Sequence, residues 1–245
     1  MKKAYLYIVL GILAALAIYV AIVYFSLGST PERIWLHRCN SLEKLEEKQA
    51  AYPNFEVDLV FREPGIFDVT HDLDKSYGLT IEPFFEHIGE TRGRMWLDIK
   101  NLSLANAALM LQAINELCET YGVEKEQLIV ESPNEEALLL FRENNFYTSY
   151  YVKFPKASRL SSSEVDSCIV LLRGVADRGN VNAISFHYSW YKPISEKLNR
   201  PSIDLLTWKN HSSEFELRFL PRNWALLGDE QVKVILVKSK GRHHR

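Results

Sequence analysis

Two histidines and three carboxylates lie at or near the ends of short apolar runs in the first half of the chain. These residues are His37, Glu56, Asp58, His71 and Asp98. Apolar runs of this length are typical of buried strands, and a parallel sheet gathers polar groups at its carboxyl edge. Buried ionisable groups are costly unless they meet one another or a metal. We therefore expect the five side chains to converge on one site.

The three carboxylates form a candidate metal site. Glu56 and Asp58 are separated by one residue, so on a strand they point to the same face. Asp98 from another strand would supply a third oxygen ligand, with Glu82 and Glu131 as alternatives for that position. Oxygen ligands favour Mg²⁺ or Ca²⁺ over Zn²⁺. Without a metal, Glu56 and Asp58 would instead form salt bridges at the rim.

The two histidines and nearby cationic groups indicate acid–base chemistry. Histidine titrates near neutral pH, so His37 and His71 can divide the work of base and acid at one scissile bond. Arg38 and Lys100 could balance the charge of a phosphate, although Arg38 could equally form a structural salt bridge. Asn40 could donate its amide to the same oxygens or cap the helix that follows it.

Strand-like segments alternate with helical patterns along the chain, which predicts a (β/α)8 TIM barrel. An open doubly wound sheet is the alternative. The expected strands are Arg33–Cys39, Phe55–Phe61, Arg94–Lys100, Leu128–Glu131, Tyr147–Phe154, Ala183–Tyr188, Ser202–Thr207 and Val232–Lys238.

Turn and capping residues refine this prediction. The turn signal Arg62–Gly65 predicts that Ile66–Asp72 folds back as a hairpin extension at the barrel mouth. Ser103 is expected to cap a helix that stops at Gly122. Asn134–Phe146 resembles the Asn-x-x-Ala helix of acetyltransferases, but no pyrophosphate-binding loop precedes it. An ordinary amphipathic helix is therefore expected there.

The N-terminal leader predicts a membrane anchor. Ala4–Leu27 contains no charged residue and would span about 36 Å as a helix. We expect residues 1–28 to form one transmembrane helix and residues 29–245 to form the barrel domain. Lys2 and Lys3 favour a cytoplasmic N-terminus and an extracytoplasmic barrel, either periplasmic or extracellular. A cleaved secretion signal is the alternative.

Composition excludes some function classes. The formal net charge is −2 and basic residues do not cluster, which argues against nucleic acid as a partner. The three cysteines show no metal-binding spacing and are expected to be free thiols.

Four short motifs occur together in the order His37-Arg38, Glu56-x-Asp58, His71-Asp72 and Asp98-x-Lys100. This arrangement resembles the glycerophosphodiester phosphodiesterase and phosphatidylinositol phospholipase C-like superfamily. The resemblance implies a TIM barrel with the two histidines as acid and base. It also implies that the three acids bind a divalent cation and that the lysine lies beside the phosphate.

Other parts of the sequence support the resemblance or depart from it. Leu205–Asn210 is similar to a Trp-Thr-x-Asn strand end of these phosphodiesterases, with the order of Thr and Trp exchanged. Trp208 could then line the headgroup pocket, or simply pack at the rim. The typical Gly after His-Arg is replaced by Cys39. Asp98 stands where Glu is usual, which is closer to the sphingomyelinase D-like branch, and the opening motif also resembles menorin-like relatives.

The resemblance implies a metal-dependent phosphodiester hydrolase that acts on glycerophosphodiesters or phospholipid headgroups. A substrate with an adjacent hydroxyl could first form a cyclic phosphate. The alternative is a catalytically silent, membrane-anchored barrel that binds a phosphorylated lipid or glycan.

Overall fold

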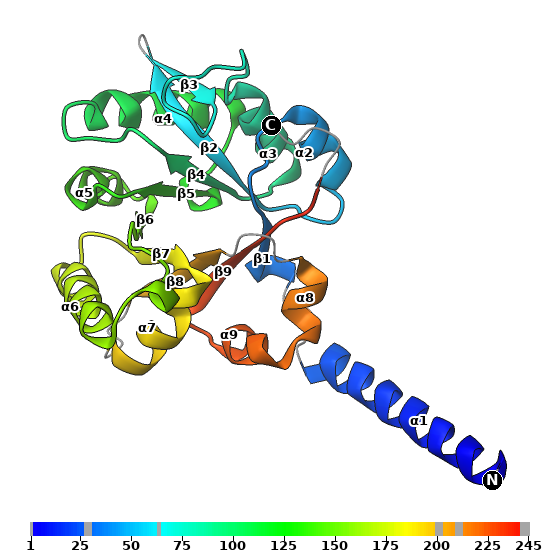
Figure 1. Ribbon diagram of the computed structural model, residues 1–245. Coiled ribbons are helices and arrows are strands. Elements are labelled where there is room, and N and C mark those ends of the chain that lie inside the picture. The colour runs from blue at the N-terminus through cyan, green and yellow to red at the C-terminus, as the bar shows by residue number, and fades with distance from the viewer. Residues whose placement is uncertain (1, 27–30, 63–64, 199–202, 209–212, 241–245) are drawn as a thin grey trace.

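Eight parallel strands curve into a barrel in the computed structural model, which describes residues 2–26, 31–62, 65–198, 203–208 and 213–240 (Figure 1). All eight coincide with segments expected from the sequence. They are β1 (Ile34–Leu36), β2 (Phe55–Arg62), β4 (Met95–Ile99), β5 (Leu128–Ser132), β6 (Tyr147–Tyr151), β7 (Ala183–His187), β8 (Asp204–Trp208) and β9 (Val232–Val237).

The barrel is closed through its first strand. β1 pairs in parallel with β9 along its whole length and with β2 at Leu36 and Phe55. The remaining neighbours follow chain order from β2 through β4 to β9. This closure confirms the TIM-barrel prediction and excludes the open doubly wound sheet.

The predicted hairpin extension is also confirmed. β3 (Ile66–Val69) runs antiparallel to β2, with Val69 opposite Leu59. Among the described strands it pairs with β2 alone, and it leads into the loop before α3. Because β2 carries two of the predicted metal ligands, the hairpin extends the barrel wall beside the candidate site.

Helices surround the strands (Figure 1). Asn134 accepts a hydrogen bond from the Ala137 amide at 3.1 Å, as a helix N-cap does, and Gly122 ends α4 in the left-handed conformation. The helices are α2 (Leu42–Lys48), α3 (Glu82–Thr91), α4 (Ala107–Tyr121), α5 (Glu135–Glu143), α6 (Ser162–Arg178), α7 (Tyr191–Lys197), α8 (Glu214–Phe219) and α9 (Trp224–Gly228).

The predicted start of α4 at Ser103 is wrong. The Asn106 side chain accepts a hydrogen bond from the Ser103 amide and donates one to the Asn101 carbonyl oxygen. These bonds hold the preceding residues in a turn, and the helix begins after Asn106.

Side chains alternate between the two faces of each strand, so the apolar residues form two layers. One lies between the strands and the helices, and the other fills the barrel interior. The interior layer contains Trp35 and Trp96, both fully buried. On β4 the residue two after Trp96 on the same face is Asp98. Trp35 and Trp96 therefore fill the barrel interior below the polar side chains of the site.

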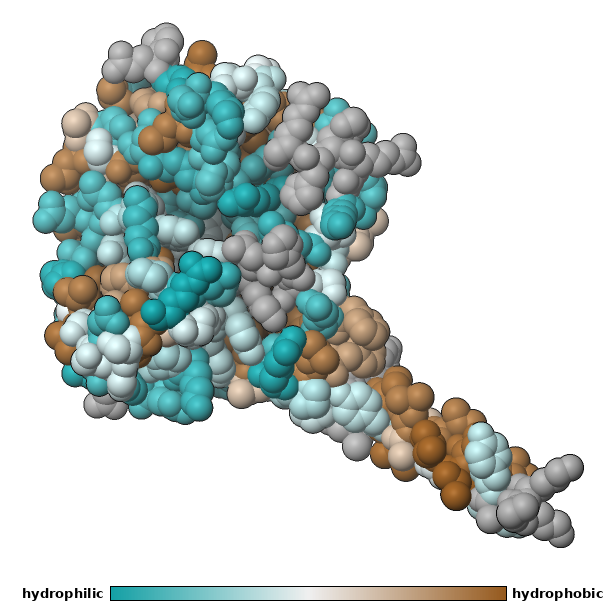
Figure 2. Space-filling model, in the orientation of Figure 1, coloured by the Kyte–Doolittle hydropathy of each residue, from teal (hydrophilic) through white to brown (hydrophobic). Residues whose placement is uncertain are grey.

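α1 (Lys2–Ser26) projects away from the barrel, and most of the apolar side chains from Tyr5 to Val20 are exposed (Figures 1 and 2). The Tyr19 hydroxyl donates a hydrogen bond to the Phe219 carbonyl oxygen at 2.6 Å, and its ring stacks on Trp224. Among the described residues, no helix combines the length and apolar character needed to cross a membrane. The predicted transmembrane anchor is therefore not supported.

Candidate active site

Three carboxylates from two adjacent strands meet in the barrel, two from the first half of β2 and one from the carboxyl end of β4. Glu56 and Asp58 come from β2 and Asp98 from β4, where Asp58 and Asp98 lie directly opposite each other. One carboxylate oxygen from each residue lies within 4.8 Å of the others. Glu56 and Asp58 are buried, and the Asp98 side chain is 15% exposed. We call these three residues the acid cluster.

Of the two alternative third acids, one lies away from the site and the other lies at its edge. Glu82 begins α3 and does not line the cavity above the acid cluster. Glu131, on β5, does line it and lies opposite Asp98, but its carboxylate accepts a hydrogen bond from the Ser185 hydroxyl. Glu131 is therefore an additional buried acid at the edge of the cluster.

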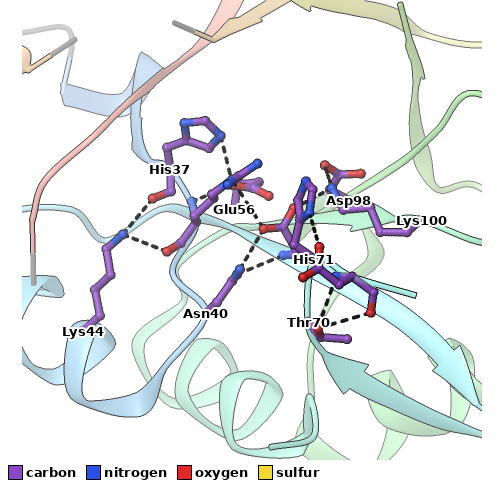
Figure 3. A network of polar contacts seen from close by, with 11 residues as sticks. His37, Asn40, Lys44, Glu56, Thr70, His71, Asp98 and Lys100 are labelled. Carbon is purple, nitrogen blue, oxygen red and sulfur yellow. Dashed lines mark hydrogen bonds and ion pairs between the residues drawn. The ribbon is translucent and has the colours of Figure 1, made fainter. Parts of the chain in front are cut away.

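The loop after β1 is attached to the acid cluster by hydrogen bonds. The Arg38 amide donates to Glu56 at 2.6 Å. The Asn40 side chain donates to the Asp58 carboxylate at 2.7 Å and accepts from the Asp58 amide at 3.0 Å (Figure 3). Asn40 thus holds a carboxylate, while Ser41 caps α2 by accepting from the Lys44 amide.

Lys44 is a residue of the site region that sequence reasoning missed. Its ammonium group donates to the carbonyl oxygens of His37 and Arg38 at 2.8 and 2.7 Å (Figure 3). The side chain is 1% exposed. Arg38 has a φ of 54°, a left-handed conformation that is uncommon outside glycine. Lys44 therefore fixes the loop that carries both His37 and Arg38.

His37 is a buried imidazole next to the acid cluster. Its Nε2 lies 3.8 Å from a Glu56 carboxylate oxygen, and its ring centre lies 6.2 Å from that of Trp208. Burial lowers the pKa of His37 to about 3, although the negative charge of Asp58 opposes this shift. The imidazole is therefore neutral at ordinary pH, which is the form that can accept a proton.

His71 has a more open environment on the opposite side of the same cavity. Its side chain is 49% exposed, and its Nδ1 lies 3.1 Å from an Asp72 carboxylate oxygen. Asp72 also accepts from the Lys75 ammonium group at 2.6 Å. Asp72 can therefore orient the imidazole, and solvent can exchange its protons.

Lys100 places a positive charge inside the acid cluster. Its ammonium group lies 2.5 Å from Asp58 and also pairs with Asp98. Burial alone would raise the pKa of Asp58, but Lys100 and Arg38 outweigh it and lower that pKa to about 2. Burial and the charge of Asp58 raise the pKa of Glu56 well above its usual range. Of the two acids on β2, Asp58 therefore has the lower pKa and stays ionised to lower pH.

A cavity of about 40 Å³ lies above the acid cluster and contains most of the predicted site. Its walls include eight of the nine predicted residues, and Asn40 lies behind Asp58. Sequence reasoning missed Tyr151, whose ring stacks on Trp208 at 6.1 Å with an interplanar angle of 6°. The predicted residues lining the cavity are His37, Arg38, Glu56, Asp58, His71, Asp98, Lys100 and Trp208.

The acid cluster is suited to a divalent cation. Oε1 of Glu56 is buried and has no hydrogen-bond partner among the described residues. An unpaired buried carboxylate oxygen is costly, and a cation would satisfy it. With three carboxylates available, the donor set matches the oxygen ligands that Mg²⁺ and Ca²⁺ take.

Comparison with known proteins identifies similar structures but no close sequence. No protein-family profile matches the chain, and no curated protein is significantly similar to it. A putative glycerophosphoryl diester phosphodiesterase from Silicibacter pomeroyi superposes with a TM-score of 0.59 at 17% identity, covering 84% of this chain and 89% of that one. The chain shares the fold of this phosphodiesterase.

Two further solved structures share this fold. A glycerophosphodiester phosphodiesterase from Parabacteroides distasonis has a TM-score of 0.56 at 13% identity, covering 86% of this chain and 94% of that one. An Oleispira antarctica phosphodiesterase, solved with the product sn-glycerol-3-phosphate, has a TM-score of 0.54 at 14% identity and covers 84% of this chain and 92% of that one.

A U32 peptidase also superposes, with a TM-score of 0.50 at 10% identity, covering 88% of this chain and 95% of that one. A barrel alone therefore does not determine the reaction, which depends on the residues of the site.

Proposed function

We propose that the chain is a divergent glycerophosphodiester phosphodiesterase-like enzyme that hydrolyses phosphodiesters with the help of a divalent cation. The observation that carries this proposal is the shared cavity, where two histidines in different environments face the acid cluster and Lys100. Binding alone does not require an acid and a base. The resemblance of the motifs supports the same reaction class, and the shared fold is compatible with it.

Glu56, Asp58 and Asp98 would hold the cation, either Mg²⁺ or Ca²⁺. When bound, such a cation polarises a phosphoryl oxygen and offsets charge that develops on it. Asn40 keeps Asp58 in place through its two hydrogen bonds. Lys100 adds a positive charge on the same side of the cavity.

The two histidines divide the proton transfers. Neutral His37 accepts the proton of the nucleophile, which is water or a neighbouring hydroxyl of the substrate. Glu56, 3.8 Å away, is placed to stabilise the imidazolium that forms. His71 donates a proton to the departing alkoxide, and its exposure lets solvent restore that proton. Arg38 supports the phosphate charge, and Trp208 shapes the cavity wall beside His37.

Glycerophosphodiesters or phospholipid headgroups are the proposed substrates. The Oleispira antarctica enzyme was solved with sn-glycerol-3-phosphate, which is consistent with a glycerol-containing diester. The extracytoplasmic location of the barrel remains a proposal that rests on the apolar leader and the lysines before it.

Hydrolysis of bis(4-nitrophenyl) phosphate by the full-length chain tests the reaction class. We expect turnover with Mg²⁺ or Ca²⁺, loss of turnover in EDTA, and at least a hundredfold reduction in His37→Ala and His71→Ala. His87→Ala is the matched control because His87 lies on α3 and does not line the cavity. A folded chain that binds the diester but does not hydrolyse it would identify a binding protein and refute the enzyme proposal.

A further inference from the structure

Lys238 follows the last strand of the barrel and lies level with His37. β1 and β9 are parallel and pair at Leu36 and Val237, so the residues after them share the carboxyl end of the barrel (Figure 1). The His37 amide donates a hydrogen bond to the Val237 carbonyl oxygen at 2.9 Å. This bond extends the pairing beyond the two strands, and it places the backbone of Lys238 beside His37.

The alternation of side chains along β9 turns Lys238 toward the barrel axis. Val234 and Leu236 belong to the interior apolar layer, whereas Ile235 and Val237 belong to the layer beneath the helices. Lys238 continues the series of Val234 and Leu236, and Leu236 lines the small cavity above the acid cluster. The partly buried side chain of Lys238 therefore lies at the mouth of the candidate active site.

Three other cations around the site already face partners within the protein. Lys100 pairs with two acids of the acid cluster, and Lys44 donates to two backbone carbonyl oxygens. The Nε atom of Arg38 lies 3.6 Å from a carboxylate oxygen of Asp58. Lys238 makes no hydrogen bond or ion pair with any other residue that the structure describes. Its positive charge is therefore available to a ligand.

A partly buried ammonium group without a partner is destabilised. Burial lowers the pKa of Lys238 and the positive charge of Arg38 lowers it further, while Glu56 and Asp58 oppose these shifts. A negative group beside Lys238 would offset both the burial and the repulsion. The anion that the proposed function brings to this position is the substrate phosphate.

We propose that Lys238 is a substrate-binding residue, whose ammonium group holds a non-bridging oxygen of the substrate phosphate on the His37 side of the cavity. Only β1 separates β9 from β2, which sets these two strands roughly 10 Å apart. An extended lysine side chain and a phosphate can together span that gap. The inference rests on the part of the proposed function that places the phosphate at the acid cluster.

Steady-state hydrolysis of bis(4-nitrophenyl) phosphate by Lys238→Met tests this role. The contact is made in the bound substrate as well as in the transition state, so its loss weakens binding rather than the chemical step. We expect KM to rise about tenfold while kcat stays within twofold. Lys238→Arg keeps the positive charge and should hold KM within about threefold of the wild type. An unchanged KM in Lys238→Met, or a fall in kcat alone, would overturn the proposal.

Lys233→Met is the matched control for these measurements. Lys233 lies on the same strand, but its side chain is 50% exposed and its ammonium group lies 3.7 Å from Asp204, the first residue of β8. It is therefore at the amino end of the barrel, away from the candidate site. Its removal should leave both KM and kcat unchanged.

Binding of phenylphosphonate separates the Lys238 proposal from the hydrolase proposal. Its dissociation constant is measured by calorimetry at saturating Mg²⁺, and we expect about tenfold weaker binding in Lys238→Met and no change in Lys233→Met. If no diester is hydrolysed but this loss of affinity is observed, the hydrolase proposal fails and the Lys238 proposal stands. Equal affinities in the wild type and Lys238→Met would refute the Lys238 proposal and leave the hydrolase proposal intact.

The positive charge of Lys238, rather than the bulk of its side chain, should hold the anion. Lys238→Met is expected to be at least as stable as the wild type in urea, because it loses no hydrogen bond to another described residue. Lys238→Glu reverses the charge and should weaken phenylphosphonate binding further than Lys238→Met does. Equal binding by these two variants would show that the charge does not hold the anion, and the proposal would fail.

Discussion

Lowering the pH from 8 to 5 should reduce the free energy of unfolding by about 2 kcal/mol through His37 alone. The cause is a difference in proton binding between the folded and unfolded states. The imidazole has an ordinary pKa of 6.5 when unfolded, and burial lowers its pKa to about 3 in the folded chain. Between these two values the unfolded chain binds a proton that the folded chain does not.

The sign and size of the effect follow from proton linkage. Above pH 6.5 both states hold neutral His37, so the histidine causes no loss of stability. At pH 5 the unfolded histidine is mostly charged while the folded one is still neutral. The gap of about 1.5 pH units, at about 1.36 kcal/mol per unit, gives about 2 kcal/mol. The loss would continue as the pH falls toward 3.

Urea unfolding of the wild type and His37→Asn between pH 8 and pH 5 isolates this contribution. EDTA is present throughout, so that divalent cations stay off the acid cluster. Other titrating groups affect both proteins, and the difference between the two pH profiles reports His37. We expect the wild type to lose about 2 kcal/mol more than the variant. Parallel profiles, within about 0.5 kcal/mol, would show that His37 is not held neutral by burial.

Three further substitutions test the contacts around the acid cluster. Lys44→Met removes the hydrogen bonds to the carbonyl oxygens of His37 and Arg38. In steady-state assays we expect kcat to fall at least tenfold while KM stays within twofold. Lys44→Arg should restore part of the lost kcat. Lys100→Met removes the ammonium group that pairs with Asp58 and Asp98. Calorimetry should then show Mg²⁺ binding that is about tenfold tighter, while the rate of turnover falls. Asn40→Ala leaves the buried Asp58 amide unpaired, and urea unfolding should show a loss of about 1–3 kcal/mol. Unchanged values in these assays would contradict the corresponding roles.

The barrel could be predicted from the sequence because its strands are short apolar runs separated by helical patterns. The same regularity located the acid cluster, since Glu56 and Asp58 share a strand face and Asp98 follows on the next parallel strand. Side chains on the same face at paired positions of neighbouring strands must lie close together once the sheet forms. The position of the candidate site therefore followed from strand order and spacing.

Features that depend on packing between distant segments could not be predicted in this way. Lys44 lies in a helix rich in exposed charges, and nothing in its neighbourhood distinguishes it from a solvated lysine. A second cavity, of about 440 Å³, exists because the start of α2 faces the loop that ends near Leu79. α4 begins after Asn106, later than predicted, because the Asn106 side chain stabilises a turn before the helix. These contacts depend on side-chain geometry that residue spacing does not encode.

Metal-dependent hydrolysis by the 245-residue chain is the measurement that would establish the proposed reaction. Glycerophosphodiesters and single-chain lysophospholipids are supplied with Mg²⁺, Ca²⁺ or EDTA, and the released alcohol and phosphomonoester are quantified. We expect turnover that needs a divalent cation, is lost in His37→Ala and His71→Ala, and persists in His87→Ala. A folded chain that binds the cation at the acid cluster but hydrolyses none of these diesters would contradict the proposed reaction.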